Sequence, residues 1–322
     1  MKLSCALPPS PDVVRVARIA ERLGYGRVWL GDSPLLYGDI WIAMARILEG
    51  TERIGAGAAV LVPHLRHVVA TASAIGTLEQ LAPGRLEIAL GTGFTARAMM
   101  GKPPLTWSFV ERYVTALRTL LAGEETTVDG AVLKLLHPAR CLAPRPIRTP
   151  LVLAANGERG LAVARRLGLG HMCAGLVPPG AHDSRFVAFG TVLEDSETFQ
   201  SDAVFERLAP VIAILYHGAY GASREGVDNL PGGAAWRASL EALPQAVQHL
   251  YLHEGHLVEV SARERPHLSR DLGAMTFSGT RADIRQKVAD LAASGVSELI
   301  FWPSGRDVER ELRTMAEALA GC

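Results

Sequence analysis

Four short segments of the 322-residue chain combine glycine or proline with polar or charged side chains. They are residues 31–34 (Gly-Asp-Ser-Pro), 62–67 (Val-Pro-His-Leu-Arg-His), 91–97 (Gly-Thr-Gly-Phe-Thr-Ala-Arg) and 156–160 (Asn-Gly-Glu-Arg-Gly). Each segment follows an apolar run that predicts a β-strand. Because α/β barrels carry their chemistry at the carboxyl ends of parallel strands, we expect the four segments to build one site.

Segment 156–160 predicts an anion site. A glycine-containing turn that opens a helix directs free backbone N–H groups, and the positive end of the helix, toward an anion. Arg159 adds a cation at the same place. We therefore expect Asn156, Gly157 and Arg159 to bind an anionic group.

The Gly91-Thr92-Gly93 turn permits a close approach of a flat ring or an extended chain to the backbone. The hydroxyl of Thr92 can donate a hydrogen bond to such a ligand. A tight turn between a strand and a helix has the same glycine pattern, so a purely conformational role stays open.

Asp32, Ser33 and His64 are the candidates for handling a proton. Asp32 follows an apolar strand, where a carboxylate is costly unless it is paired or faces a cavity. Capping of the following turn is the alternative role for Asp32. No metal site is predicted. His67 is expected to start a helix while His64 faces solvent or substrate, and His253-Glu254-Gly255-His256 lacks the spacing of the His-Glu-x-x-His zinc motif and contains a glycine that disfavours a helix.

Short apolar runs alternate with helical patterns, which is typical of a parallel sheet with crossover helices. The predicted strands are Lys2–Leu7, Arg27–Leu30, Ile54–Val62, Leu86–Leu90, Leu151–Ala155, His171–Ala174, Phe186–Leu193 and Val296–Phe301. The predicted helices are Val13–Leu23, Trp41–Leu48, His67–Leu81, Trp107–Leu121, Leu161–Leu167 and Val308–Leu319, with a hairpin at Thr126–Leu135. Eight alternating strands predict one (β/α)8 TIM-barrel domain over residues 1–322, with a mostly helical insertion at about 202–274, before the last strand.

The composition excludes several classes of protein. Lys+Arg and Asp+Glu both number 33, so the basic footprint of a nucleic-acid-binding protein is absent. No run reaches the ~18–20 apolar residues of a membrane-spanning helix. Four dispersed cysteines (Cys5, Cys141, Cys173 and Cys322) predict reduced thiols and a cytoplasmic location.

Several segments together resemble the luciferase-like superfamily of flavin- and deazaflavin-dependent oxidoreductases. The similar segments are residues 28–32, 57–67, 84–93, 154–157, 278–280 and 293–296. The resemblance covers nearly the whole chain. It is nearest to the deazaflavin-dependent branch of methylenetetrahydromethanopterin reductase and the deazaflavin-dependent glucose-6-phosphate dehydrogenase.

This resemblance implies a cofactor ring at the barrel mouth, against a bulge in the third strand. It implies a non-prolyl cis peptide there, at Ala59–Val60. The cofactor-binding residues that it implies, together with those argued above, are Asp32, Ala59, Val60, Val62, Thr92, Gly93, Asn156, Gly157 and Arg159.

The departures from the family pattern are informative. Ser33 and Phe94 stand where the sugar-phosphate dehydrogenase has a histidine and a glutamate, and Ala6 stands where the reductase has a glutamate. Neither of these reactions therefore transfers to this chain. Phe94, Met99 and Met100 suit either a hydrophobic substrate or simple packing.

The predicted function is hydride transfer between the deazaflavin F420 and an unidentified small organic molecule. An FMN-dependent monooxygenase that acts through a peroxyflavin is the first alternative, and a non-catalytic flavin-binding barrel is the second. The resemblance also implies a homodimer. We expect neither nucleic acid nor a membrane as a partner.

Overall fold

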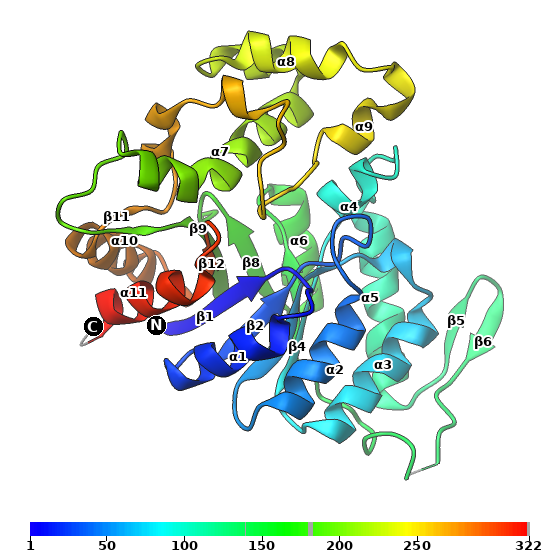
Figure 1. Ribbon diagram of the computed structural model, residues 1–322. Coiled ribbons are helices and arrows are strands. Elements are labelled where there is room, and N and C mark those ends of the chain that lie inside the picture. The colour runs from blue at the N-terminus through cyan, green and yellow to red at the C-terminus, as the bar shows by residue number, and fades with distance from the viewer. Residues whose placement is uncertain (139, 180–182, 321–322) are drawn as a thin grey trace. The chain divides into compact units, whose positions relative to one another are not determined.

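Eight parallel strands form a closed barrel in the computed structural model (Figure 1), which describes residues 1–138, 140–179 and 183–320. The strands are β1 (Lys2–Leu7), β2 (Arg27–Leu30), β3 (Gly55–Leu61), β4 (Leu86–Leu90), β7 (Leu151–Ala154), β8 (Gly170–Ala174), β9 (Ser184–Gly190) and β12 (Val296–Pro303). Around the barrel they follow the order β1-β12-β9-β8-β7-β4-β3-β2. The predicted fold class is confirmed.

The helices described are α1 (Val13–Arg22), α2 (Ile40–Gly50), α3 (Val68–Leu81), α4 (Phe94–Ala98), α5 (Trp107–Ala122), α6 (Glu158–Leu167), α7 (Asp202–Ala222), α8 (Gly233–Glu241), α9 (Gln248–Tyr251), α10 (Arg281–Ala293) and α11 (Val308–Leu319). Local sequence explains several of their limits. The Asp39 carboxylate accepts hydrogen bonds from the backbone N–H groups of Trp41 and Ile42 at the start of α2. Gly123 ends α5 in the left-handed region, at φ +85°.

Two compact units can be distinguished, and each is described by itself. The first comprises residues 1–94, 104–187 and 294–300, and the second comprises residues 95–103, 188–293 and 301–322. The single-domain organisation stays a prediction.

The seventh predicted strand, Phe186–Leu193, is wrong in its last three residues. The barrel strand β9 ends at Gly190, and β10 (Val192–Leu193) pairs instead with β11 (Gly279–Thr280) in a separate parallel sheet. The backbone N–H of Phe277 donates to the carbonyl of Phe189 at 2.8 Å. A Cβ at Gly190 would lie 2.1 Å from the Phe277 carbonyl oxygen, so glycine permits this close crossing.

The amino-terminal end of the barrel encloses a group of paired charges. Glu87 lies 3.1 Å from Arg27 and 2.7 Å from Arg185. The indole N–H of Trp29 donates to Glu298 at 2.8 Å. Each of these buried charges has an opposite charge or a hydrogen-bond partner. The free-energy cost of burying an unpaired charge is therefore avoided.

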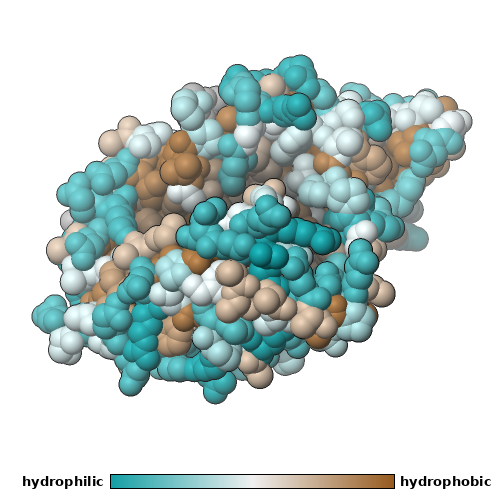
Figure 2. Space-filling view, turned by 90° about the horizontal axis from the view of Figure 1, so that it is seen from above, coloured by the Kyte–Doolittle hydropathy of each residue, from teal (hydrophilic) through white to brown (hydrophobic). Residues whose placement is uncertain are grey.

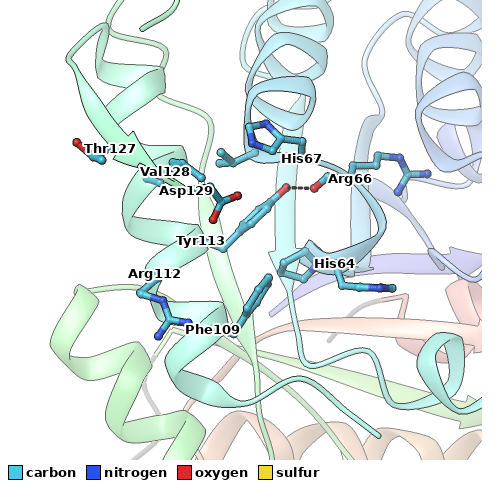
Figure 3. Close-up of a pocket in the computed structure, with 12 residues that line it drawn as sticks. His64, Arg66, His67, Phe109, Arg112, Tyr113, Thr127, Val128 and Asp129 are labelled. Atoms are coloured by element: carbon cyan, nitrogen blue, oxygen red, sulfur yellow. Dashed lines mark hydrogen bonds between the residues drawn. The ribbon is translucent and has the colours of Figure 1, made fainter. Parts of the chain in front are cut away.

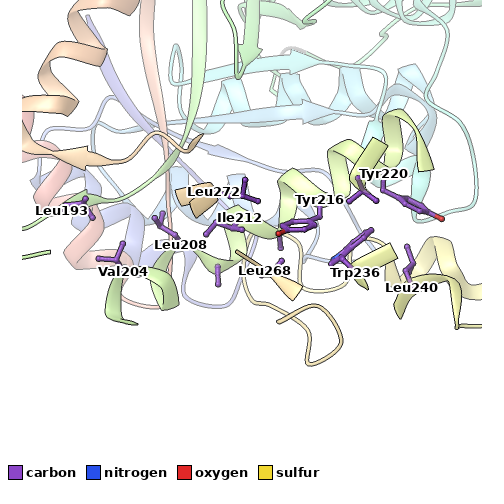
Figure 4. Packing of buried hydrophobic residues seen from close by; sticks show 13 residues of the cluster. Leu193, Val204, Leu208, Ile212, Tyr216, Tyr220, Trp236, Leu240, Leu268 and Leu272 are labelled. Carbon is purple, nitrogen blue, oxygen red and sulfur yellow. The ribbon is translucent and has the colours of Figure 1, made fainter. Parts of the chain in front are cut away.

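Helices α7 and α8 supply most residues of an apolar core cluster in the second unit (Figure 4). Tyr216 and Trp236 are fully buried in it, and their ring centroids are 5.9 Å apart. The predicted insertion is thus helical, with short 3-10 segments at η2 (Arg224–Asn229), η3 (Gln245–Val247), η4 (Arg265–His267) and η5 (Arg270–Met275).

None of the helices within the described residues is long and apolar enough to cross a membrane. Apolar residues occur in several groups among hydrophilic ones on the face shown in Figure 2. Cys5, Cys141 and Cys173 are free thiols, as predicted, while Cys322 lies outside the described residues.

Candidate functional site

All the predicted site residues lie in the first unit, in the segments that follow β2, β3, β4 and β7 or at the end of β3. These four strands are consecutive neighbours around the barrel. Because the strands are parallel, the segments after them lie along the same rim, as predicted.

A bulge interrupts β3 at the predicted position. Ala58 pairs with Ile88 and Leu61 pairs with Leu90, so β3 carries one extra residue between these two pairs. The peptide bond between Ala59 and Val60 is cis. Both features that the family resemblance implied for this strand are therefore confirmed.

The bulge explains one glycine of the Gly-Thr-Gly turn. A Cβ at Gly91 would lie 2.9 Å from Cγ2 of Val60, so the Val60 side chain occupies the space that any other residue would need. Gly93 has φ +75°, a backbone conformation that favours glycine. The carbonyl of Thr92 between them accepts a hydrogen bond from the backbone N–H of Leu105 at 2.9 Å.

Asp32 is only 4% exposed and is engaged by two donors. Nη1 of Arg66 lies 2.8 Å from Oδ2 and 3.0 Å from Oδ1, and the backbone N–H of Val62 donates to Oδ2 at 3.2 Å. Burial raises the pKa of the Asp32 carboxyl, and the charge and hydrogen bonds of Arg66 oppose that rise. We expected a carboxylate at this position to be either paired or facing a cavity. The structure shows that Asp32 is paired.

Arg66 had not been identified from the sequence as a site residue. Its second nitrogen, Nη2, lies 3.0 Å from Oδ2 of Asp39, so one guanidinium joins two carboxylates. Its backbone carbonyl accepts a hydrogen bond from the Tyr113 hydroxyl at 3.1 Å. The only signal in the sequence was the place of Arg66 between His64 and His67.

His64 belongs to the short 3-10 helix η1 (Pro63–Leu65) and lines a cavity of about 450 Å³ (Figure 3). The other walls of this cavity come from the start of α3, from α5 and from the hairpin of β5 (Thr126–Val128) and β6 (Ala131–Leu133). Phe109 and Tyr113 are its aromatic residues. Among the predicted site residues, His64 alone lines this cavity within the part of the chain described.

The predicted anion segment opens α6, which begins at Glu158, three residues before the predicted start at Leu161. Asn156, Gly157 and Arg159 are exposed there, and Oδ1 of Asn156 accepts the backbone N–H of Ala174 at 3.2 Å. Glu158 places a carboxylate in the first helical turn, where Arg165 pairs with it at 3.1 Å. This terminus therefore offers N–H groups together with charges of both signs.

Gly160 serves packing rather than ligand binding. A Cβ at this position would lie 2.4 Å from the Ala155 Cβ and 2.4 Å from Cζ2 of Trp107. Gly157, by contrast, has nothing within 4 Å of its Cβ position. The first turn of α6 can thus approach α5 only because residue 160 is glycine.

The apolar residues predicted near the mouth fall in different surroundings. Phe94 is 46% exposed and is the last residue of the first segment of the first unit. In the second unit Met100 is 38% exposed, whereas Met99 is buried. Ser33 and Thr92 are half-buried on the rim.

Known proteins are similar to this chain in sequence or in fold. It is 29% identical over 187 residues to a 5,10-methylenetetrahydromethanopterin reductase of Methanolobus tindarius, covering 55% of this chain and 54% of the relative. It is 31% identical over 183 residues to an F420-dependent glucose-6-phosphate dehydrogenase of Beutenbergia cavernae, covering 50% and 52%. The chain thus spans about half the length of these curated relatives in the matches.

Solved structures match over almost the full length. The F420-dependent tetrahydromethanopterin reductase of Methanopyrus kandleri has a TM-score of 0.68 at 16% identity, over 99% of this chain and 98% of that one. The monooxygenase RslO1 of Streptomyces bottropensis has a TM-score of 0.61 at 19% identity, over 99% of both chains. The sequence profile described as luciferase-like monooxygenase matches residues 6–298. The chain therefore belongs to the luciferase-like monooxygenase family.

Proposed function

We propose that this protein is an oxidoreductase that transfers a hydride between the deazaflavin F420 and a small organic substrate. The observation that carries the proposal is the surface of the β3 bulge. Ala59 and Val60 are the half-buried positions of a strand that is otherwise buried. They leave backbone and small apolar groups accessible near the carboxyl end of β3, which suits a flat ring. Two curated relatives and one solved structure named above act with F420 or on a methanopterin substrate, which supports the same choice.

In this proposal the cofactor-binding residues divide by what they offer. The cofactor ring and the cofactor's side chain contact the backbone and small side chains of Ala59, Val60, Val62, Thr92 and Gly93. The free N–H groups at the start of α6, with Asn156, Gly157 and Arg159, hold the phosphate. These groups suit a phosphodiester, which carries one negative charge. The backbone N–H groups and the exposed Arg159 can balance that charge, although Glu158 lies beside them.

F420, when bound, supplies the redox chemistry. Asp32 is almost fully buried and has both carboxylate oxygens engaged by Arg66, so we assign it the positioning of the segments after β2 and β3, which border the proposed cofactor site. Proton handling then falls to Ser33 or His64, which follow the same two strands. His64 is the stronger candidate, since an imidazole exchanges a proton near neutral pH.

The FMN-dependent monooxygenase remains the second candidate, favoured by the likeness to RslO1. FMN ends in a phosphomonoester with close to two negative charges at neutral pH. Glu158 in the first turn of α6 opposes such a dianion, which is why we rank F420 first. A flavin-binding barrel without catalysis is the third.

Titration of the purified protein with F420 and with FMN, followed by cofactor fluorescence, separates these proposals. We expect saturable binding of F420 at least tenfold tighter than that of FMN. Tight FMN binding with weak F420 binding would replace hydride transfer by the monooxygenase. Binding of F420 without oxidation or reduction of it by any of a panel of alcohols, aldehydes and enones would favour the non-catalytic barrel.

Two further predictions concern partners. The ligand is a small organic molecule, and the family resemblance implies a homodimer. Light scattering after size-exclusion chromatography measures the mass directly, and a monomer of 34.5 kDa would contradict the dimer.

A further inference from the structure

Three histidines meet at the edge of the apolar core of the second unit. His217 lies in α7, and His253 and His256 lie in the turn that follows α9. Each offers a ring nitrogen, and these nitrogens lie within 4.8 Å of one another. His217 and His253 are 1% and 0% exposed, and the His217 ring centroid lies 5.9 Å from that of Trp236, a residue labelled in Figure 4.

The turn itself brings His253 and His256 together. The backbone N–H of His256 donates to the carbonyl of His253 at 3.1 Å. Gly255 between them has φ +69°, and a Cβ there would lie 2.5 Å from the Glu259 carbonyl oxygen, so the turn requires glycine. The ring centroids of His253 and His256 are 5.0 Å apart, and those of both lie 5.2–5.6 Å from His217.

A carboxylate fixes the orientation of His217. Oε1 of Glu264 lies 2.6 Å from Nε2 of His217. Because a carboxylate only accepts, Nε2 carries the hydrogen, and the neutral ring presents its lone pair at Nδ1. This Nδ1 lies 3.3 Å from Nδ1 of His256.

Glu264 is itself held in place. The indole N–H of Trp236 donates to Oε1 at 3.1 Å, and the hydroxyl of Ser261 donates to Oε2 at 3.1 Å. Arg263 lies 3.5 Å from Oε1 and balances its charge. A histidine whose second nitrogen donates to a fixed carboxylate is the usual arrangement around protein-bound zinc.

We propose that His217, His253 and His256 bind a divalent metal ion, zinc, and that Glu264 orients His217 for it. In tetrahedral coordination with Zn–N bonds of about 2.0–2.1 Å, neighbouring ligand nitrogens lie about 3.3–3.4 Å apart. The two Nδ1 atoms already have this separation, and the third nitrogen has to move inward by at most about 1.5 Å. Three imidazoles leave the fourth position to water.

The site would join the turn after α9 to α7 within this unit. It does not depend on which redox cofactor the barrel binds. The sequence pattern predicted no metal here because it considered the His253-x-x-His256 pair alone. The third ligand, His217, precedes His256 by 39 residues, a separation that no local motif contains.

The test uses the full-length protein, freed of metal by a chelator and then titrated with zinc in competition with a chromophoric chelator. We expect one equivalent of zinc to bind, and cobalt(II) bound in its place to give the visible absorption of a four-coordinate ion. His253→Ala should weaken zinc binding at least 100-fold. Glu264→Gln, which keeps the shape of the side chain, should weaken it about 10–100-fold.

His249→Ala is the matched control, because it removes an imidazole of the same unit from outside the group, and its zinc affinity should stay within threefold of wild type. Circular dichroism checks that each variant is folded. If the buried His253→Ala does not fold, the half-buried His256→Ala takes its place. Binding of less than one equivalent by the wild type, or equal affinity in the wild type, His256→Ala and Glu264→Gln, overturns the proposal. The group would then be a hydrogen-bonded pair, with His256 donating from Nδ1.

Discussion

Arg66 and Asp32 join the loops after β3 and β2 through two hydrogen bonds of 2.8 and 3.0 Å. The side chain of Asp32 is almost fully buried, and that of Arg66 is 18% exposed. Arg66 also reaches Asp39 at 3.0 Å, where α2 begins. One cation therefore determines the relative position of two of the four loops on the rim.

Removing this cation should be strongly destabilising. Arg66→Ala leaves the buried Asp32 carboxylate without its counter-charge, which costs about 3–5 kcal/mol in the free energy of unfolding. Without Arg66 the pKa of Asp32 rises further, because Arg66 is what opposes the effect of burial. A group with a raised pKa contributes stability at low pH that is lost as the pH rises through that pKa. The deficit should therefore be smaller at mildly acidic than at neutral pH.

Urea unfolding at several pH values measures this dependence. Arg112→Ala is the matched control, because Arg112 lines the same cavity as Arg66 but is exposed. A deficit independent of pH would contradict the assigned role of Asp32.

Gly91→Ala tests the fit between β4 and the bulge. The new Cβ would lie 2.9 Å from Val60, and relief of this overlap should cost about 1–3 kcal/mol and displace the Val60 side chain. Adding Val60→Ala should recover most of the loss. Thermal unfolding of both single variants and the double variant gives the coupling energy. Additive effects would show that Val60 moves away without strain.

Gly93→Val is expected to abolish cofactor binding. A branched side chain there would occupy the space assigned to the ring or its chain, and φ +75° is unfavourable for valine by about 1–3 kcal/mol. Gly24→Val is a matched control, since Gly24 has φ +85° with no atom near its Cβ position and precedes β2, away from the rim. F420 titration of both variants, with folding checked by circular dichroism, isolates the effect on binding. Wild-type affinity in a folded Gly93→Val protein would remove this turn from the site.

Arg159→Ala distinguishes the two cofactors. For the F420 diester we expect less than a tenfold loss of affinity, which equals about 1.4 kcal/mol. Glu158→Gln should strengthen binding of either cofactor, about two- to fivefold, because it removes a negative charge from the first turn of α6. Fluorescence titration measures both changes. A loss far above tenfold in Arg159→Ala, together with tight FMN binding by the wild type, would favour the monooxygenase.

Glu197 should contribute to stability in a pH-dependent manner. Hydrogen bonds of 2.8 and 2.6 Å from Arg207 lower the pKa of Glu197 below 4.5. A lowered pKa gives stability that is fully present above the ordinary pKa and is lost as the pH falls through the lowered one. Glu197→Gln should thus cost about 1–3 kcal/mol at pH 7 and progressively less below pH 4.5. Urea unfolding with and without the substitution checks the window.

Local sequence was a good guide to the strands and to the rim of the barrel. Hydrophobic periodicity and the glycine-rich turns were sufficient because strand ends and helix starts are determined by nearby residues. The family resemblance, rather than periodicity, led to the cis peptide at Ala59–Val60. The specific site roles of Ser33, His64 and the anion segment stay predictions.

Most of the features missed depend on residues far apart in the chain. Arg66 and Asp32 are separated by 34 positions, and the local sequence around either residue does not predict that they form an ion pair. Helix α4 (Phe94–Ala98) is only five residues long, too short to give a periodic pattern. The departure of the chain from the barrel at Gly190 depends on Phe277, whose position no local pattern contains.

The paired charges at the amino-terminal end of the barrel also fix how the strands align. Strand β3 begins Gly-Ala-Gly-Ala-Ala, so it has little side-chain bulk with which to specify its register. Nη1 of Arg27, from β2, reaches the backbone carbonyls of Ala56 and Arg85 at 3.1 and 2.9 Å, and its Nη2 is paired with Glu87. A slip of β3 by one residue would move the Ala56 carbonyl away from Arg27 and would turn the side chains of β3 to the opposite face of the sheet. The paired charges at the amino-terminal end thus set the register of β3, whose small side chains specify it poorly and whose carboxyl end carries the bulge.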